Sequence, residues 1–131
     1  MIITDRQDAL AEWLCSRTGG DPAKVKGTYI GNELGGKIVA VTGYDRFTGD
    51  TVRIHIAGEG KGGWFSREFC RFCFYYPFEQ LKVKKVIGHV RGDNEAALRF
   101  DRHLGFIEEE YISERDLHVL TMTKEQCRFL S

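Results

Sequence analysis

The sequence lacks any apolar run that approaches the roughly 20 residues needed by a membrane-spanning helix. Residues 1–17 also lack the basic segment followed by an apolar one that marks a secretory signal. There is no excess of charge of one sign, since Lys and Arg together number 19 and so do Asp and Glu. Nucleic-acid-binding proteins usually carry a basic excess that neutralises phosphates. We therefore expect a cytoplasmic protein with no membrane and no nucleic-acid partner.

The four cysteines do not have the spacing that completes a metal site. Cys70 and Cys73 form a CxxC pair, but no second pair or nearby histidine supplies the remaining ligands of a zinc ion. Both lie in an aromatic stretch, because eight of the 16 aromatic residues fall between Trp64 and Phe78. Buried cysteine behaves as a small hydrophobic residue in such surroundings. We expect both thiols to be buried, reduced and free of metal.

The chain does contain an ordered series of helical and extended patterns. Thr4 and Gln7 form a capping box before a first helix, and three extended runs follow: Thr28–Asn32, Lys37–Tyr44 and Thr51–Ala57. The run of four apolar residues from Ile38 to Val41 favours a strand covered on both faces. We therefore expect an antiparallel meander behind one amphipathic helix.

The second half of the chain again contains helical and extended patterns in turn. Ser66 begins a helix that reaches Tyr76, with Phe69, Phe72, Cys73 and Tyr76 on one face, and Pro77 stops or kinks it. A strand over Lys82–Val90 and a helix capped by Asp93 or Asn94 follow, with Ala97, Phe100 and Leu104 as its buried stripe. Phe106–Ile112 and Leu117–Met122 form a closing hairpin, and Thr123 with Gln126 caps a short terminal helix. At 131 residues the prediction is one α/β (α+β) domain with a mixed sheet and helices on its faces.

One segment carries a longer pattern. It comprises a strand-ending Val90, a helix-capping Asn94, Ala97 three residues on, the apolar Phe100 three further, and Gly105-Phe106 at the helix end. This pattern resembles the GNAT superfamily of N-acetyltransferases. The resemblance implies a single GNAT-like acyl-CoA N-acyltransferase domain over residues 1–131. Its N-terminal helical region is shortened, since family members usually place two helices there. In architecture alone the chain also resembles compact chains predicted in phage genomes.

The resemblance further implies an acetyl-CoA site and no metal. In this family a glycine-rich loop between a strand and a helix N-terminus holds the pyrophosphate through backbone amides. The matching segment supplies Gly58, Lys61, Gly62, Gly63, Trp64, Phe65 and Ser66. Counted from Glu59, Gly62 matches the family's loop pattern, whereas Trp64 stands where a small residue is usual. The alternative reading is a plain glycine-rich turn.

The pantetheine arm is expected where the strands Thr51–Ala57 and Lys82–Val90 part. Backbone groups near Ile56 and Ala57 would lie along it, and one of these amides would polarise the thioester carbonyl. Asn94 is carried over as a helix cap and a cofactor contact, with capping alone as the alternative.

Two side chains are candidates for catalysis. His55 lies on the strand that leads to the thioester, and imidazole titrates near neutrality, which suits a base; His89 on the neighbouring strand is a weaker alternative. Asp101 follows Phe100, where the family often has a tyrosine that acts as the acid. An ordinary Asp is ionised at neutral pH, so the sequence favours a salt-bridged or solvated Asp101 over an acid. Trp64, Phe65 and Tyr44 would line an acceptor pocket or simply pack in the core.

Two functions follow from these residues. The first is an N-acetyltransferase that moves an acetyl group from acetyl-CoA directly to a primary amine. The second is a non-catalytic CoA-binding or protein-interaction module that keeps the fold and has lost the chemistry. The departures at Trp64 and Asp101 favour the second, whereas the segment from Val90 to Phe106 is compatible with both. A homodimer is compatible with either function.

Overall fold

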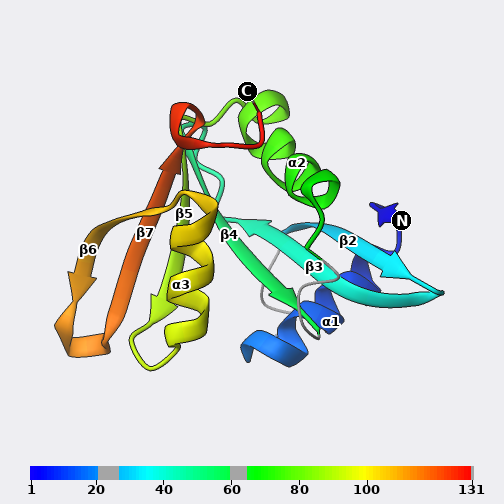
Figure 1. Ribbon diagram of the computed structural model, residues 1–131, viewed down its shortest axis with the longest axis horizontal. Coiled ribbons are helices and arrows are strands. Elements are labelled where there is room, and N and C mark those ends of the chain that lie inside the picture. The colour runs from blue at the N-terminus through cyan, green and yellow to red at the C-terminus, as the bar shows by residue number, and fades with distance from the viewer. Residues whose placement is uncertain (21–26, 60–64, 131) are drawn as a thin grey trace. The chain divides into compact units, whose positions relative to one another are not determined.

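A computed structural model describes residues 1–20, 27–59 and 65–130. The strands are β1 (Ile2–Ile3), β2 (Thr28–Leu34), β3 (Lys37–Asp45), β4 (Thr51–Gly58), β5 (Lys85–Arg91), β6 (Ile107–Ile112) and β7 (Leu117–Thr123). The helices are α1 (Gln7–Thr18), α2 (Arg67–Tyr75) and α3 (Glu95–Leu104). The strands form one mixed sheet in the order β1-β2-β3-β4-β5-β7-β6 (Figure 1). The predicted architecture, a mixed sheet with helices, is confirmed.

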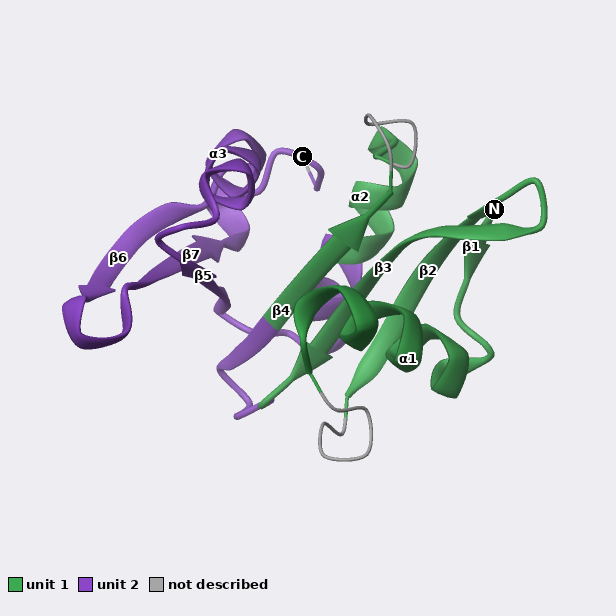
Figure 2. Cartoon of the chain, turned by 90° about the horizontal axis from the view of Figure 1, so that it is seen from below, with its two compact units in different colours: residues 1–46, 54–73 green, residues 47–53, 74–131 purple. Residues whose placement is uncertain are grey.

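The chain divides into two compact units (Figure 2). Unit 1 comprises Met1–Arg46 and Ile54–Cys73, and unit 2 comprises Phe47–Arg53 and Phe74–Ser131. Strand β4 therefore contributes its first three residues to unit 2 and the remainder to unit 1. No helix in the described part of the chain is both long and apolar enough to span a bilayer.

Strand β3 of unit 1 is covered on both of its faces, as its apolar run predicts. Val41 packs in one cluster with Leu10 and Leu14 of α1. On the opposite face, the Thr42 hydroxyl lies 3.1 Å from Cys73 Sγ of α2. Successive side chains of a strand point to opposite faces, so neighbouring residues of β3 face different helices.

A glycine lets α1 approach the sheet closely. Gly43 of β3 pairs with Tyr29 of β2, and a Cβ placed on Gly43 would lie 2.6 Å from Leu14 Cδ2 and 2.9 Å from the Tyr29 ring. Any larger residue at this position would force the side chains of Leu14 or Tyr29 to shift. Figure 2 shows α1 lying across these strands within unit 1.

The N-terminus of α1 differs from the prediction. The capping position is Arg6, with a left-handed backbone and no side-chain cap, so the Thr4–Gln7 capping box is wrong. Instead, the Gln7 amide donates to the carbonyl of Tyr29 and accepts from its N–H, both at 2.8 Å. The side-chain amide of Gln7 thus pairs with the backbone of β2 as a neighbouring strand would. It satisfies the N–H and the carbonyl of Tyr29, which would otherwise lack partners.

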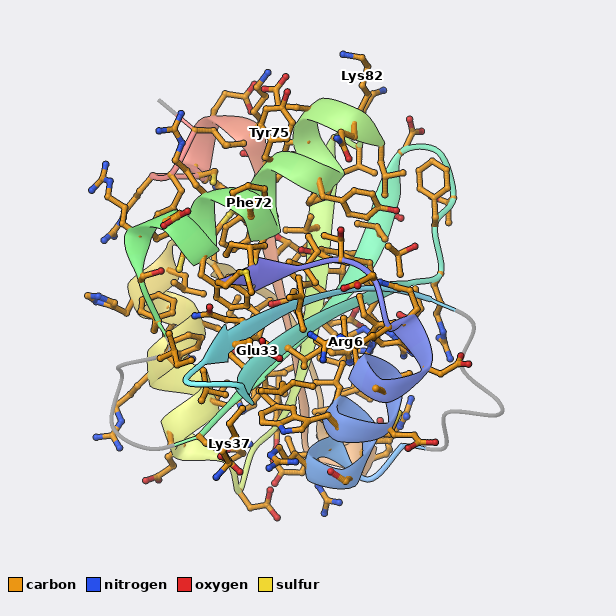
Figure 3. The ribbon with its side chains drawn as sticks, turned by 90° about the vertical axis from the view of Figure 1, so that its right-hand side faces the viewer. Arg6, Glu33, Lys37, Phe72, Tyr75 and Lys82 are labelled. Carbon is orange, nitrogen blue, oxygen red and sulfur yellow. The ribbon has the colours of Figure 1, made fainter. Side chains whose placement is uncertain are left out.

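Helix α2 is capped as predicted but buries a different face. Ser66 Oγ accepts from the N–H of Phe69 at 3.0 Å. Phe69 and Cys73 are buried, whereas Phe72 is 46% exposed and the prediction that it lies in the core is wrong. Phe72 and Tyr75 project from the outer face of the helix (Figure 3). Pro77 does not stop the helical path, which continues as a π-helical turn over Tyr76–Gln80.

Unit 2 is built on the strands β5, β7 and β6. β5 pairs in parallel with β4 over Thr51–Arg53 and antiparallel with β7 along its whole length, and β6 pairs antiparallel with β7. The predicted caps of α3 are confirmed: Asn94 Oδ1 accepts from the N–H of Ala97 at 3.2 Å, and Gly105 ends the helix with φ 118°. The buried residues of α3 are Leu98 and Leu104, while Ala97 and Phe100 are only half-buried.

Candidate active site

His55 lies on β4 in unit 1, beside a buried carboxylate. Its Nε2 is 3.1 Å from Oδ1 of Asp45, the last residue of β3. The Asp45 side chain is 7% exposed and the His55 side chain 29%. His55 and Ala57 share a face of β4 by strand alternation, and Ala57 packs against the α1 cluster. The histidine is therefore a half-buried group on the α1 side of the sheet, in contact with the side chain of Asp45.

The end of β4 is anchored at Glu59. Its N–H donates to the carbonyl of Val39 at 2.9 Å. Its carboxylate forms an ion pair with Arg17 of α1, and Lys37 Nζ lies 3.5 Å from its other oxygen. The hydrogen bond from Arg17 is the main cause that lowers the pKa of Glu59. The backbone that carries Ile56, Ala57 and Gly58 is thus tied to β3 and α1 immediately before the predicted pyrophosphate loop.

The loop itself is only partly described. Lys61, Gly62, Gly63 and Trp64 lie outside the described residues. Phe65 is half-buried, and the hydroxyl of the exposed Ser66 serves as the cap of α2. The capping of α2 by Ser66 agrees with a strand–loop–helix order at this point.

Asp101 on α3 in unit 2 differs from the expectation of a solvated or salt-bridged carboxylate. It is half-buried, and desolvation by burial raises its pKa from 3.8 to about 7. A Cβ placed on Gly88 of β5 would lie 3.6 Å from Asp101 Oδ2, so the carboxyl group faces the backbone of that strand. Among the described residues, no Lys, Arg or His side chain forms an ion pair with the Asp101 carboxylate. Burial thus favours the protonated form of Asp101 well above the pH at which an ordinary aspartate ionises.

The remaining predicted residues occupy simpler settings. Asn94 is exposed and caps α3, and its contact with a ligand stays a prediction. His89 is exposed on β5, opposite Val119 of β7. Tyr44 is 3% exposed and its hydroxyl donates to the carbonyl of Cys73, so it is a core residue of unit 1.

One residue at the site was not singled out from the sequence. Asp45 ends the β3 run ten positions before His55, and the only available signal was an acidic residue that directly follows an apolar strand. The hydrogen bond to His55 depends on how β3 and β4 lie together, which a linear pattern does not specify.

The CxxC pair belongs to the core. Cys70 and Cys73 are each 2% exposed and neither forms a disulfide, which confirms the predicted burial. Within the described ranges no group of three His, Cys, Asp or Glu side chains is placed to hold a metal ion. Burial raises the pKa of the Cys73 thiol to about 12. The thiolate is the reactive form of cysteine, so this thiol is inert at neutral pH.

We therefore expect Cys73 to resist alkylation in the native protein. Folded protein treated with iodoacetamide at pH 7.5 should leave Cys73 unmodified, whereas denatured protein should react fully at the same pH. Mass spectrometry of the peptide that contains Cys70 and Cys73 measures both. Rapid labelling of Cys73 under native conditions, at the rate of a model thiol, would show that Cys73 is not buried against β3 as described.

Comparison with known proteins gives matches in structure and not in sequence. No family model matches the chain, and a comparison with curated proteins found no significant match. The chain is similar to the N-acetyltransferase PseH of Campylobacter jejuni in complex with acetyl coenzyme A, with a TM-score of 0.68, 14% identity, and coverage of 95% of this chain and 99% of that one. The fold is that of the GNAT acetyltransferases.

Two further structures agree with this GNAT fold. Spermidine N-acetyltransferase from Vibrio cholerae, in complex with CoA and spermine, matches with a TM-score of 0.68 and 17% identity over 92% of this chain and 76% of that chain. A GNAT-family acetyltransferase from Bacillus anthracis matches with a TM-score of 0.61 and 15% identity over 74% of this chain and 66% of that chain. The fold expected from residues 90–106 is therefore confirmed.

Proposed function

We propose that the chain is an N-acetyltransferase that moves the acetyl group of acetyl-CoA directly to a primary amine. The observation that carries the proposal is the match over nearly the full length of PseH, a protein solved with acetyl-CoA. The match to a spermidine N-acetyltransferase solved with CoA and spermine suggests polyamines as the first acceptors to test. Fold alone does not assign activity, so the proposal also depends on the chemistry of named residues.

Two stretches of the chain would bind the CoA moiety. Backbone amides of Gly58, Gly62 and Gly63, with Lys61 as an added positive charge, would hold the pyrophosphate at the N-terminus of α2. Trp64, Phe65 and Ser66 complete that segment. The backbone of β4 at Ile56 and Ala57 would lie along the pantetheine arm, and Asn94 is assigned as a further contact. The anchoring of Glu59 to Val39 and Arg17 supports this assignment, because a fixed backbone presents its amides without reorganisation.

The proposed reaction needs one base and one acid. His55 accepts a proton from the ammonium form of the acceptor, directly or through water, which frees the nitrogen lone pair. The amine nitrogen then bonds to the thioester carbon, and a backbone amide at Ile56 or Ala57 stabilises the oxyanion. When the carbon–sulfur bond breaks, Asp101 donates its proton to the departing thiolate, and the second proton of the attacking nitrogen leaves to solvent, which gives the neutral amide. A carboxyl group with a pKa near 7 can donate to a thiol whose usual pKa is about 8.5.

We expect acetyl-CoA to raise the thermal stability of the protein, because a ligand that binds only the folded state stabilises it. Binding at 100 times Kd would add about 2.7 kcal/mol to the free energy of unfolding. Replacing Gly62 and Gly63 together with valine should remove the shift, since side chains there would block backbone approach to the phosphates. Lys82→Ala, at an exposed position of unit 2, is the matched control and should keep it.

Differential scanning fluorimetry with acetyl-CoA and free CoA measures the shift, and release of free thiol with spermidine measures turnover. No thermal shift at millimolar acetyl-CoA would contradict the proposal. A shift without turnover on a broad panel of amines would favour the non-catalytic CoA-binding module instead.

A further inference from the structure

A buried carboxylate and a half-buried imidazole form a pair in unit 1. The distance from His55 Nε2 to Asp45 Oδ1 is 3.1 Å, within the range of a hydrogen bond. Asp45 is 8% exposed although it ends a strand, a place where an aspartate can usually turn to water. Burial of an ionised carboxylate is costly unless hydrogen bonds or opposite charge offset it. The position of Asp45 is therefore determined by its partners, one of which is the His55 ring.

The surroundings of the pair come from four elements. Tyr29 of β2 is 4% exposed; burial raises the pKa of its phenol, and the nearby Cys15 and Asp45 raise it further. Arg53 lies two residues before His55, on the same face of β4 by strand alternation. Tyr29 stays neutral at physiological pH because its pKa moves away from neutrality. Of these groups, Asp45 contacts the imidazole directly, and Arg53 shares its face of β4.

The hydrogen bond selects one form of the neutral imidazole. An ionised carboxylate can only accept a hydrogen bond, so beside the ionised form of Asp45 the Nε2 of His55 carries the proton and donates it. The lone pair of neutral His55 is then on Nδ1. When Nδ1 takes up a proton, the carboxylate beside the ring stabilises the imidazolium that results.

We infer that Asp45 is a positioning residue for His55: it holds the ring in the Nε2–H form and makes Nδ1 the atom that accepts the proton from the acceptor amine. This inference rests on the proposed function for its catalytic part. The orienting of the ring by Asp45 is a property of the folded chain and is tested separately. No bond other than N–H forms or breaks at His55: a proton leaves the acceptor nitrogen, directly or through water, and arrives at Nδ1.

The first experiment uses the whole chain and needs no substrate. Nitrogen-15 chemical shifts of the His55 ring, recorded above its titration, should show Nε2 protonated and Nδ1 unprotonated. The pH titration of the ring should move to lower pH by about one unit in Asp45→Asn, because a stabilising negative charge is lost. Glu33→Gln is the matched control, since it removes another acidic side chain of unit 1 that pairs with Arg6 (Figure 3). The control should leave the His55 titration unchanged.

The second experiment measures the pH dependence of acetyl transfer with spermidine as the acceptor. The acidic limb of kcat/KM should move to lower pH in Asp45→Asn by the same amount as the titration, and kcat at pH 7 should fall at least about 10-fold. Asp45→Glu, which restores a carboxylate, should recover part of the rate. A purely structural role would lower stability and leave the limb in place.

The outcomes separate the two ideas. An Nδ1–H ring in the unmodified protein, or a His55 titration unchanged in Asp45→Asn, overturns the inference whether or not the protein has activity. If Asp45→Asn fails to fold, the ring tautomer of the unmodified protein still decides. The expected titration together with no turnover on any amine would contradict the proposed function and leave the positioning of the ring in place.

Discussion

Replacing His55 with alanine should lower the rate of acetyl transfer by about 10²–10⁴-fold, the usual contribution of a general base. His55 is the histidine of unit 1, an ordinary imidazole titrates near neutrality, and this residue lies on the strand assigned to the thioester. Acetyl-CoA affinity should change little, because backbone groups of β4 and the loop are assigned to the cofactor. The fall should therefore appear in kcat, with the thermal shift given by acetyl-CoA retained.

The measurement is a pH–rate profile with spermidine, accompanied by a cofactor titration of each variant. His103→Ala is the matched control, because His103 is exposed on α3 and has no assigned role. It should behave as the unmodified protein does. A rate and acidic limb unchanged in His55→Ala would exclude His55 as the base and would turn attention to His89.

The second large effect is expected from Asp101→Asn, and it has a stability part and a rate part. Burial raises the pKa of Asp101 to about 7, whereas an unfolded chain shows the ordinary value of 3.8. Between these values the folded protein binds a proton that the unfolded chain has lost. The stability contributed by the protonated carboxyl is fully present below about pH 4 and is lost as pH rises through 7. Above pH 7 a half-buried charge destabilises the fold.

Asparagine removes this pH dependence because it stays neutral. The stability of Asp101→Asn relative to the unmodified protein should therefore increase from pH 4 to pH 8. The full shift corresponds to no more than about 4 kcal/mol, and solvent screening of the half-buried group reduces it. Urea unfolding at both pH values measures the change. Asp93→Asn, at a side chain that is 69% exposed, should give no such trend. A flat difference for Asp101→Asn would show that water reaches this carboxyl freely.

The same variant should lose acetyl transfer at pH 7, by about 10²–10⁴-fold if Asp101 supplies the proton to the thiolate. Asp101→Tyr restores the residue that the resembled family uses and keeps its proton to higher pH, since tyrosine titrates near 10. We expect the basic limb of the pH–rate profile to move upward in Asp101→Tyr. A rate unaffected by Asp101→Asn would mean that solvent protonates the thiolate.

Local patterns predicted most of the secondary structure because the forces involved act over a few residues. Asn94 offers an acceptor to the free amides of α3, and Gly105 adopts the left-handed backbone that ends it, whatever lies around them. The glycines between β2 and β3 and the alternation in β4 likewise need only their neighbours in sequence. The GNAT pattern from Val90 to Phe106 is likewise a local feature, because its spacing is that of a strand end, a helix cap and one helix.

Tertiary structure decided which faces are covered and how site groups ionise. Helical spacing puts Phe69, Phe72 and Cys73 close together, but the surface that α2 meets covers the Phe69 and Cys73 side and leaves Phe72 in water. Gln7 meets β2 instead of capping α1, because an extended backbone with free groups lies beside it.

The two proposed catalytic side chains show the same division. The sequence placed His55 and Asp101 at positions suited to a base and an acid. It did not decide the protonation state of either side chain. Desolvation depends on atoms distant in the chain: the pKa of Asp101 rises because α3 sets its carboxyl against β5 at Gly88. The partner of His55 is an aspartate on another strand. Sequence thus determined the elements and their order, whereas the protonation of the site was decided by packing, because burial and partner distance are properties of the folded chain.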